Sequence, residues 1–187
     1  MTKTVNVKTD FIQPIAVLTA ICLVCSVLLA YINSITEKVI ADTENSMAQE
    51  AMGEVLPGAS GFTKLDVELP ATYDDGTENF VTAVYQADSG EGYVFMITGN
   101  GYGGNGTMKL ITSVDPGGSI IATQTLQHAE TAGVGSKTTE EDYRSRWAGV
   151  NLDSIDSVDG ITGASVSSGH YLNSMRSVFQ AYAYITK

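Results

Sequence analysis

A group of hydroxyl side chains near the C-terminus offers the clearest chemistry in this sequence. The segment Asp159-Gly-Ile-Thr-Gly-Ala-Ser165 is followed by Val166-Ser-Ser-Gly169 and then by a helical pattern. The glycines allow a tight turn, and the hydroxyls stand just before the N-terminus of the expected helix. A helix N-terminus presents free N–H groups and the positive end of the helix dipole, so it suits a phosphate. A simple Ser or Thr N-cap is the alternative reading.

A second glycine cluster matches the pattern GxGxxG but does not predict a dinucleotide site. Gly99-Asn-Gly-Tyr-Gly-Gly104 is followed by Thr107–Val114, which has the composition of a strand. A dinucleotide fingerprint needs a helix directly after the glycines, because the helix N-terminus holds the pyrophosphate. The cluster is therefore interpreted as a glycine-rich turn that joins two strands.

Composition excludes some classes of function. The chain has 187 residues and a formal net charge of −11, so it would repel nucleic acid. Its only cysteines, Cys22 and Cys25, lie three residues apart in an apolar run, where packing on one helix face is favoured over thiol or metal chemistry. No disulfide framework, no catalytic residue and no set of metal ligands is expected in the remainder of the chain.

The apolar run Phe11–Ile32 has no charged residue and is long enough to cross a bilayer as a helix. Lys3 and Lys8 precede it and mostly acidic residues follow it, so the positive-inside rule predicts a cytoplasmic N-terminus. We expect a cytoplasmic tail over 1–10, a transmembrane helix over 11–33 and an extracytoplasmic domain over 34–187. A cleaved signal peptide is the alternative, but the run is long for a signal and no clear cleavage site follows.

The remainder predicts an α+β domain with a mostly antiparallel sheet flanked by helices. An amphipathic helix is expected over Thr36–Leu56, a short one over Thr138–Trp147 with a capping box and Trp147 in the core, and a final one beginning near Ser167. Asp115-Pro-Gly-Gly118 predicts a hairpin turn. Five runs rich in β-branched or aromatic residues predict strands, namely Lys64–Leu69, Phe80–Tyr85, Tyr93–Thr98, Thr107–Val114 and Ile120–Leu126.

The Asp159–Ser165 segment resembles the flavinylation motif of FMN-binding domains, Asp-x-x-Thr-Gly-Ala-Thr/Ser. Such domains occur in the G subunit of the Rnf electron-transport complex and in the C subunit of the sodium-translocating NADH:quinone reductase. The resemblance implies that FMN is joined through its phosphate to the Ser165 hydroxyl. It also implies recognition roles for Asp159, Thr162, Gly163 and Ala164. The family more often has Thr at the acceptor position, and Ser keeps the hydroxyl.

Two further segments support this resemblance. Gly101-Tyr-Gly-Gly104 is similar to a glycine motif of the Rnf family. His128-Ala-Glu-Thr-Ala-Gly-Val-Gly-Ser-Lys137 resembles that family's His-x-Glu-Thr-Pro-Gly-Leu-Gly-x-Lys, with Ala132 and Val134 as departures. His128, Glu130 and Thr131 are accordingly expected near the flavin. Their structural alternatives are a strand end and a solvated loop.

The resemblance implies an electron-transfer subunit of a membrane-bound ferredoxin:NAD oxidoreductase that is coupled to Na⁺ or H⁺ translocation. The expected partners are the other subunits and a flavin transferase during maturation. A free-standing anchored flavoprotein for extracellular electron transfer is one alternative. A non-redox anchored binding module, in which the serines only cap a helix, is another.

Overall fold

The computed structural model describes residues 13–187 and separates the chain into two compact units. The first unit ends at Ser46, and the second covers Met47–Lys187. The predicted tail over 1–10 and the first two residues of the predicted transmembrane segment lie outside the described residues.

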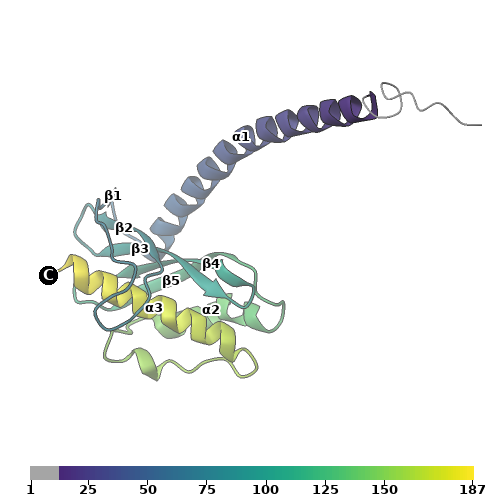
Figure 1. The fold of residues 1–187 in the computed structure, drawn as a ribbon. Helices are drawn as coiled ribbons and strands as arrows, with labels where there is room; N and C mark the ends of the chain where they lie inside the picture. Colours follow the sequence, from purple (N-terminus) through teal and green to yellow (C-terminus); the bar gives the residue numbers. More distant parts are fainter. Residues whose placement is uncertain (1–12) are drawn as a thin grey trace, which may run out of the picture. The chain divides into compact units, whose positions relative to one another are not determined.

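Helix α1, Gln13–Val55, contains the apolar run of the first unit (Figure 1). Its segment Ile15–Asn33 has a mean hydropathy of 2.7 and is long and apolar enough to cross a membrane. The large apolar side chains of this segment are exposed. A helix with an apolar surface all round suits a lipid environment, because its backbone hydrogen bonds are satisfied internally.

The expected helix over Thr36–Leu56 is the continuation of α1, which ends where the sequence predicts a stop. Leu56 N–H still donates to the Met52 carbonyl at 3.0 Å. The ring of Pro57 then removes a donor, and Gly58 has a φ of 106°, a left-handed conformation that glycine adopts easily.

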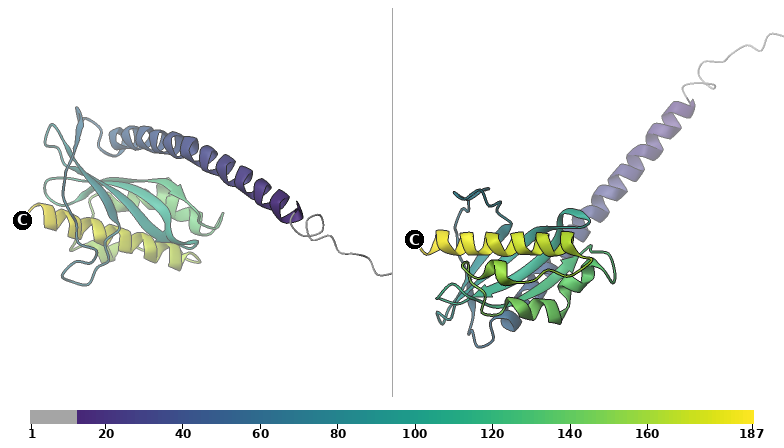
Figure 2. Two further views of the ribbon diagram at one scale, coloured as in Figure 1. Left: turned by 45° about the horizontal axis from the view of Figure 1, so that its top comes forward. Right: turned by 90° about the horizontal axis from the view of Figure 1, so that it is seen from below.

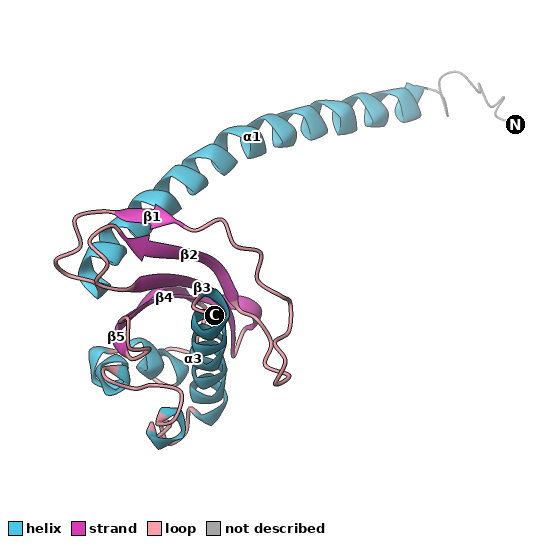
Figure 3. Ribbon diagram, turned by 90° about the vertical axis from the view of Figure 1, so that its left-hand side faces the viewer, coloured by secondary structure: helices cyan, strands magenta, loops and turns pink. Residues whose placement is uncertain are grey.

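The second unit contains a five-stranded antiparallel sheet in the order β1-β2-β3-β4-β5 (Figure 3). The strands are β1 Phe62–Lys64, β2 Val81–Ala87, β3 Tyr93–Gly101, β4 Gly104–Val114 and β5 Ile120–His128. Neighbours in sequence are neighbours in the sheet, so short turns make every connection after β2. The predicted α+β class with an antiparallel sheet is confirmed.

The prediction of a strand over Lys64–Leu69 is wrong. Only Phe62–Lys64 pairs with β2, and the last backbone bond of this edge joins Leu65 N–H to the Val84 carbonyl at 2.9 Å. Beyond this point β2 has a register shift in its pairing with β3, between Val81 and Ala83. Pro70, which has no N–H to donate, follows directly.

Both faces of the sheet are covered by helices of the same unit (Figure 2). Phe95 and Ile97 of β3 pack in a cluster with the final helix α3, Ser165–Ile185. Val94, on the opposite face of the same strand, packs in a second cluster with Met52 and Val55 at the end of α1. The alternation follows from the period of two along a strand.

The segment before α3 is helical in short pieces. They are the 3-10 helix η2 Gly135–Thr139, the helix α2 Glu141–Arg144, and the 3-10 helices η3 Ser145–Trp147 and η4 Ile155–Ser157. The predicted capping box is wrong, because Glu140 is the N-cap of α2 and makes no side-chain cap bond. The Thr138 hydroxyl is buried and donates to the Gly135 carbonyl at 2.7 Å.

Candidate functional site

Ser165 is the first residue of α3, and its side chain is exposed. The N-cap is Ala164, which makes no side-chain cap hydrogen bond. The helix begins at Ser165, two residues before the predicted position, so Ser165 does not act as the cap. The first N–H groups of a helix have no intrahelical acceptor, and here no side chain of the N-cap satisfies them. The Ser165 hydroxyl therefore stands beside free donors at the positive end of a long helix dipole.

The loop before α3 is held in place by the helix itself. Ser168 Oγ accepts a hydrogen bond from Ile161 N–H at 2.9 Å. Ala164 N–H donates to the Ile161 carbonyl at 2.9 Å and closes the turn. Gly163 has a φ of 85°, which a residue with a Cβ adopts only at a cost. The positive φ explains why the turn favours glycine at position 163.

A pocket of about 330 Å³ lies beside the Ser165 hydroxyl. Its volume is within the roughly 300–1,000 Å³ that is usual for small-molecule sites. Apolar and hydroxyl side chains share its lining, which consists of Tyr143, Val158, Gly160, Ile161, Thr162, Ser165, Ser168, Gly169 and Leu172. Two of the residues expected from the motif, Thr162 and Ser165, thus meet in one cavity.

Tyr143 is a part of this site that the sequence interpretation did not identify, and Arg146 packs against it from outside the pocket lining. The Arg146 guanidinium lies 5.5 Å from the centre of the Tyr143 ring, binds the Asp142 carboxylate and reaches the Asp159 carbonyl at 3.5 Å. Burial raises the pKa of the Tyr143 phenol, although the Ser168 hydroxyl and Arg146 oppose this change. The phenol therefore stays protonated at neutral pH. Tyr143 and Arg146 are three residues apart, a spacing that places both on one face of the predicted helix over 138–147. That spacing was the one signal in the sequence that could have linked them.

The remaining residues expected from the Asp159–Ser165 segment lie around the pocket. Gly163 and Ala164 shape the turn, and neither lines the cavity. Asp159 is exposed, and its backbone carbonyl, not its carboxylate, meets Arg146.

The predicted residues of the His128–Lys137 loop are not in the pocket lining. His128 is exposed, and its Nδ1 accepts from Glu130 N–H at 3.3 Å. Thr131 is exposed too, and its carbonyl accepts from Ser136 N–H at 3.2 Å. Glu130 is buried, with 8% of its surface exposed. Contact of these three residues with a flavin remains a prediction.

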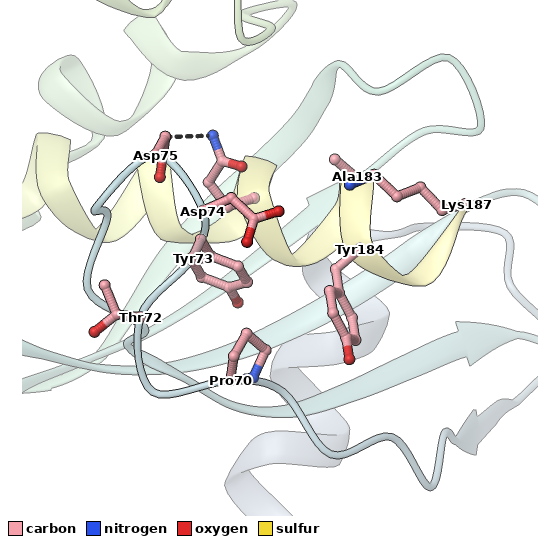
Figure 4. A pocket seen from close by; sticks show the side chains of 9 residues that line it. Pro70, Thr72, Tyr73, Asp74, Asp75, Ala183, Tyr184 and Lys187 are labelled. Atoms are coloured by element: carbon pink, nitrogen blue, oxygen red, sulfur yellow. Dashed lines mark hydrogen bonds between the residues drawn. The ribbon is translucent and has the colours of Figure 1, made fainter.

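A second hollow of about 250 Å³ lies between the loop that contains Asp74 and Asp75 and the C-terminal end of α3 (Figure 4). Gln180 Nε2 donates to Asp75 Oδ2 at 2.7 Å. Hydrogen bonds from Thr77 hold the pKa of Asp75 below its usual range, so this carboxylate is charged at neutral pH. Two adjacent carboxylates repel a phosphate, so this hollow suits an anion less well than the pocket beside Ser165 does.

The resemblance inferred from the motifs is confirmed by comparison with known proteins. Residues 101–180 match the FMN-binding domain. The chain is 28% identical, over 90% of its length and 92% of the relative, to the G subunit of the ion-translocating oxidoreductase complex of Methanosarcina acetivorans. It is 24% identical to the G subunit of the same complex from Shewanella piezotolerans, over 82% of this chain and 81% of the relative. It is 23% identical to the G subunit of the proton-translocating ferredoxin:NAD(+) oxidoreductase complex of Clostridium ljungdahlii, over 81% of this chain and 80% of the relative.

Proposed function

We propose that this chain is an electron-transfer subunit of a membrane-bound, ion-translocating oxidoreductase of the Rnf type, with FMN joined covalently to Ser165. The observation that carries the proposal is the exposed Ser165 hydroxyl at the N-terminus of α3, beside a pocket of about 330 Å³. The FMN-binding match and the names of the relatives, all G subunits of such complexes, support it.

The residues present fit FMN. The free N–H groups at the start of α3 suit the phosphate, and the hydroxyls of Thr162 and Ser168 offer polar contacts in the pocket. Tyr143 and Leu172 give the same pocket an apolar wall for an aromatic ring. Bound FMN supplies the redox chemistry, and the chain supplies position and electrostatics.

The attachment is a phosphoryl transfer from FAD catalysed by a flavin transferase. Ser165 Oγ bonds to the phosphorus of the FMN half, and the pyrophosphate P–O bond breaks. AMP leaves, and the hydroxyl proton passes to a base of the transferase. No electron is transferred in this step, and the product is a phosphodiester that retains one negative charge near the helix N-terminus.

Peptide mapping tests the proposal. The full chain is produced together with a flavin transferase, denatured, separated on a gel and viewed for flavin fluorescence. We expect fluorescence that stays with the chain and a mass increase equal to FMN minus water on the peptide that contains Ser165. A colourless chain, with a known substrate of the transferase labelled in parallel, contradicts the covalent assignment and favours the binding-module alternative.

The location of the domain is a further part of the proposal. Lys3 and Lys8 precede the apolar segment of α1 and mostly carboxylates follow it, so we place the N-terminus in the cytoplasm and residues 34–187 outside. Protease added to intact cells without an outer barrier should then digest the FMN-binding domain and spare a short N-terminal fragment. Digestion that occurs only after the cells are lysed would mean that the domain lies in the cytoplasm, and it would contradict the proposed orientation.

Membership of a complex is tested by purification. An affinity tag on this chain should recover polytopic membrane subunits in fixed proportion from mild detergent. Recovery of the flavinylated chain alone would favour the free-standing flavoprotein.

A further inference from the structure

The carboxylate of Glu130 connects three segments that are far apart in the sequence. Its Oε1 accepts a hydrogen bond from Tyr102 N–H, in the turn between β3 and β4, at 2.8 Å. Its Oε2 accepts a hydrogen bond from the Ser167 hydroxyl, in the first turn of α3. Glu130 itself follows β5 and has 8% of its surface exposed. Both carboxylate oxygens are thus engaged by protein donors.

Two glycines make room for this carboxylate. A Cβ added at Gly101 would overlap Glu130 Oε1, and one added at Gly135 would overlap both Glu130 Oε2 and Ser167 Oγ. Gly101 belongs to the end of β3 and Gly135 to the start of η2. The backbone is therefore packed around Glu130 from both sides, and a side chain at either position would push the carboxylate away from its partners.

We infer that Glu130 is a positioning residue for flavin attachment, which acts through Ser167 to fix the first turn of α3 and thereby the Ser165 hydroxyl. The inference rests on the proposed function. Ser165 stands two residues before Ser167 in a turn whose N–H groups have no intrahelical acceptor. The Ser168 hydroxyl ties this turn to the loop before it, and the Ser167–Glu130 bond ties it to the end of β5. An acceptor hydroxyl must be held in line with the phosphorus it attacks, and small misplacements slow such reactions strongly.

This role differs from contact with the flavin ring in what it requires of the side chain. Positioning requires a side chain long enough to reach both Tyr102 N–H and Ser167 Oγ, and it does not require a negative charge. Gln satisfies it, because its carbonyl accepts from Tyr102 N–H and its amide N–H donates to the lone pairs of Ser167 Oγ. Asp keeps the charge but is one methylene shorter and cannot reach both partners.

The test measures flavinylation of the full chain in detergent by a flavin transferase with FAD, as initial rates against the concentration of this chain. We expect E130A and E130D to lower kcat by roughly 10- to 100-fold. KM for the chain should stay within about twofold, because docking of the transferase is unchanged. E130Q should lose less than about tenfold, since neutral hydrogen bonds replace charge-assisted ones.

Two other variants complete the comparison. E68A removes an exposed carboxylate and should label at the wild-type rate. S167A removes the helix partner of Glu130, and its effect should not add to that of E130A, because both break the same link. Circular dichroism verifies that each variant is folded at the assay temperature. Where E130A is not, E130Q and E130D carry the test.

The outcomes are distinguishable. A wild-type chain that takes no flavin overturns the proposed function and this inference together. Wild-type labelling with undiminished rates in E130A and E130D overturns only the inference. Slow labelling of E130Q together with fast labelling of E130D would mean that the charge of Glu130 is needed. A shifted flavin reduction potential in labelled E130Q would mean the same. Either result overturns the positioning role.

Discussion

Replacing Ser165 with Ala should give a folded chain that carries no covalent flavin. The hydroxyl is the only group removed, it is exposed, and no hydrogen bond to another described residue is lost with it. Ala is also the best helix former, so the stability of the fold should change by less than about 0.5 kcal/mol. The measurement is in-gel flavin fluorescence after denaturation, with intact mass to confirm that the FMN increment is missing.

Two variants serve as controls for this result. Ser165→Thr keeps a hydroxyl on the Cβ atom and should retain covalent flavin. Ser157→Ala removes an exposed hydroxyl from η4, in the segment leading to the motif, and should label like the wild type. Covalent flavin retained in Ser165→Ala would move the attachment to another residue, and mapping would identify it.

Replacing Trp147 with Ala should destabilise the domain by roughly 3–5 kcal/mol. The indole is fully buried and stacks on Tyr171 with ring centres 5.5 Å apart. Tyr143 meets the Trp147 ring edge-on at 6.2 Å and also lines the pocket beside Ser165. Loss of the indole leaves a cavity that the rigid surroundings cannot fill, so the pocket wall should loosen as the fold weakens.

Urea unfolding of the full chain in detergent, followed by far-ultraviolet circular dichroism, measures this loss. The matched control is Tyr184→Ala, an aromatic truncation on α3 where 47% of the residue's surface is exposed. The control should cost less than about 1 kcal/mol. A Trp147→Ala variant as stable as this control would mean that the aromatic cluster does not support the site.

Much of the fold follows from local patterns. The uncharged run in α1 predicts a membrane-crossing helix, because it is apolar and long enough to cross the bilayer core as a helix. Runs rich in β-branched and aromatic residues predict β2, β3, β4 and β5. The Asp115 turn predicts the hairpin between β4 and β5, and Asp115 Oδ1 indeed accepts from Gly117 N–H at 2.8 Å. The glycines from Gly99 to Gly104 join β3 to β4, which confirms the turn and excludes the dinucleotide helix.

The errors lie where distant contacts override local signals. The first strand ends at Lys64, where its pairing with β2 stops, and no pattern within Lys64–Leu69 reveals how far a partner strand continues. The spacing of Thr138 and Glu141 resembles a capping box, but Thr138 is buried within η2 and its hydroxyl donates to the Gly135 carbonyl instead. Capping signals depend on the backbone conformation at the cap, and packing decides that conformation.

The sequence by itself identified Ser165 as the candidate acceptor, because the motif Asp159–Ser165 carries its chemistry in consecutive residues. It also determined the turn at Gly163 and the helix that follows. Only the tertiary structure decided what surrounds this hydroxyl: Tyr143 arrives from α2, and Glu130 reaches Ser167 from 37 positions earlier. The physical reason is that chain spacing fixes neighbours within a turn or a helix, whereas burial and hydrogen-bond satisfaction select which remote side chains meet.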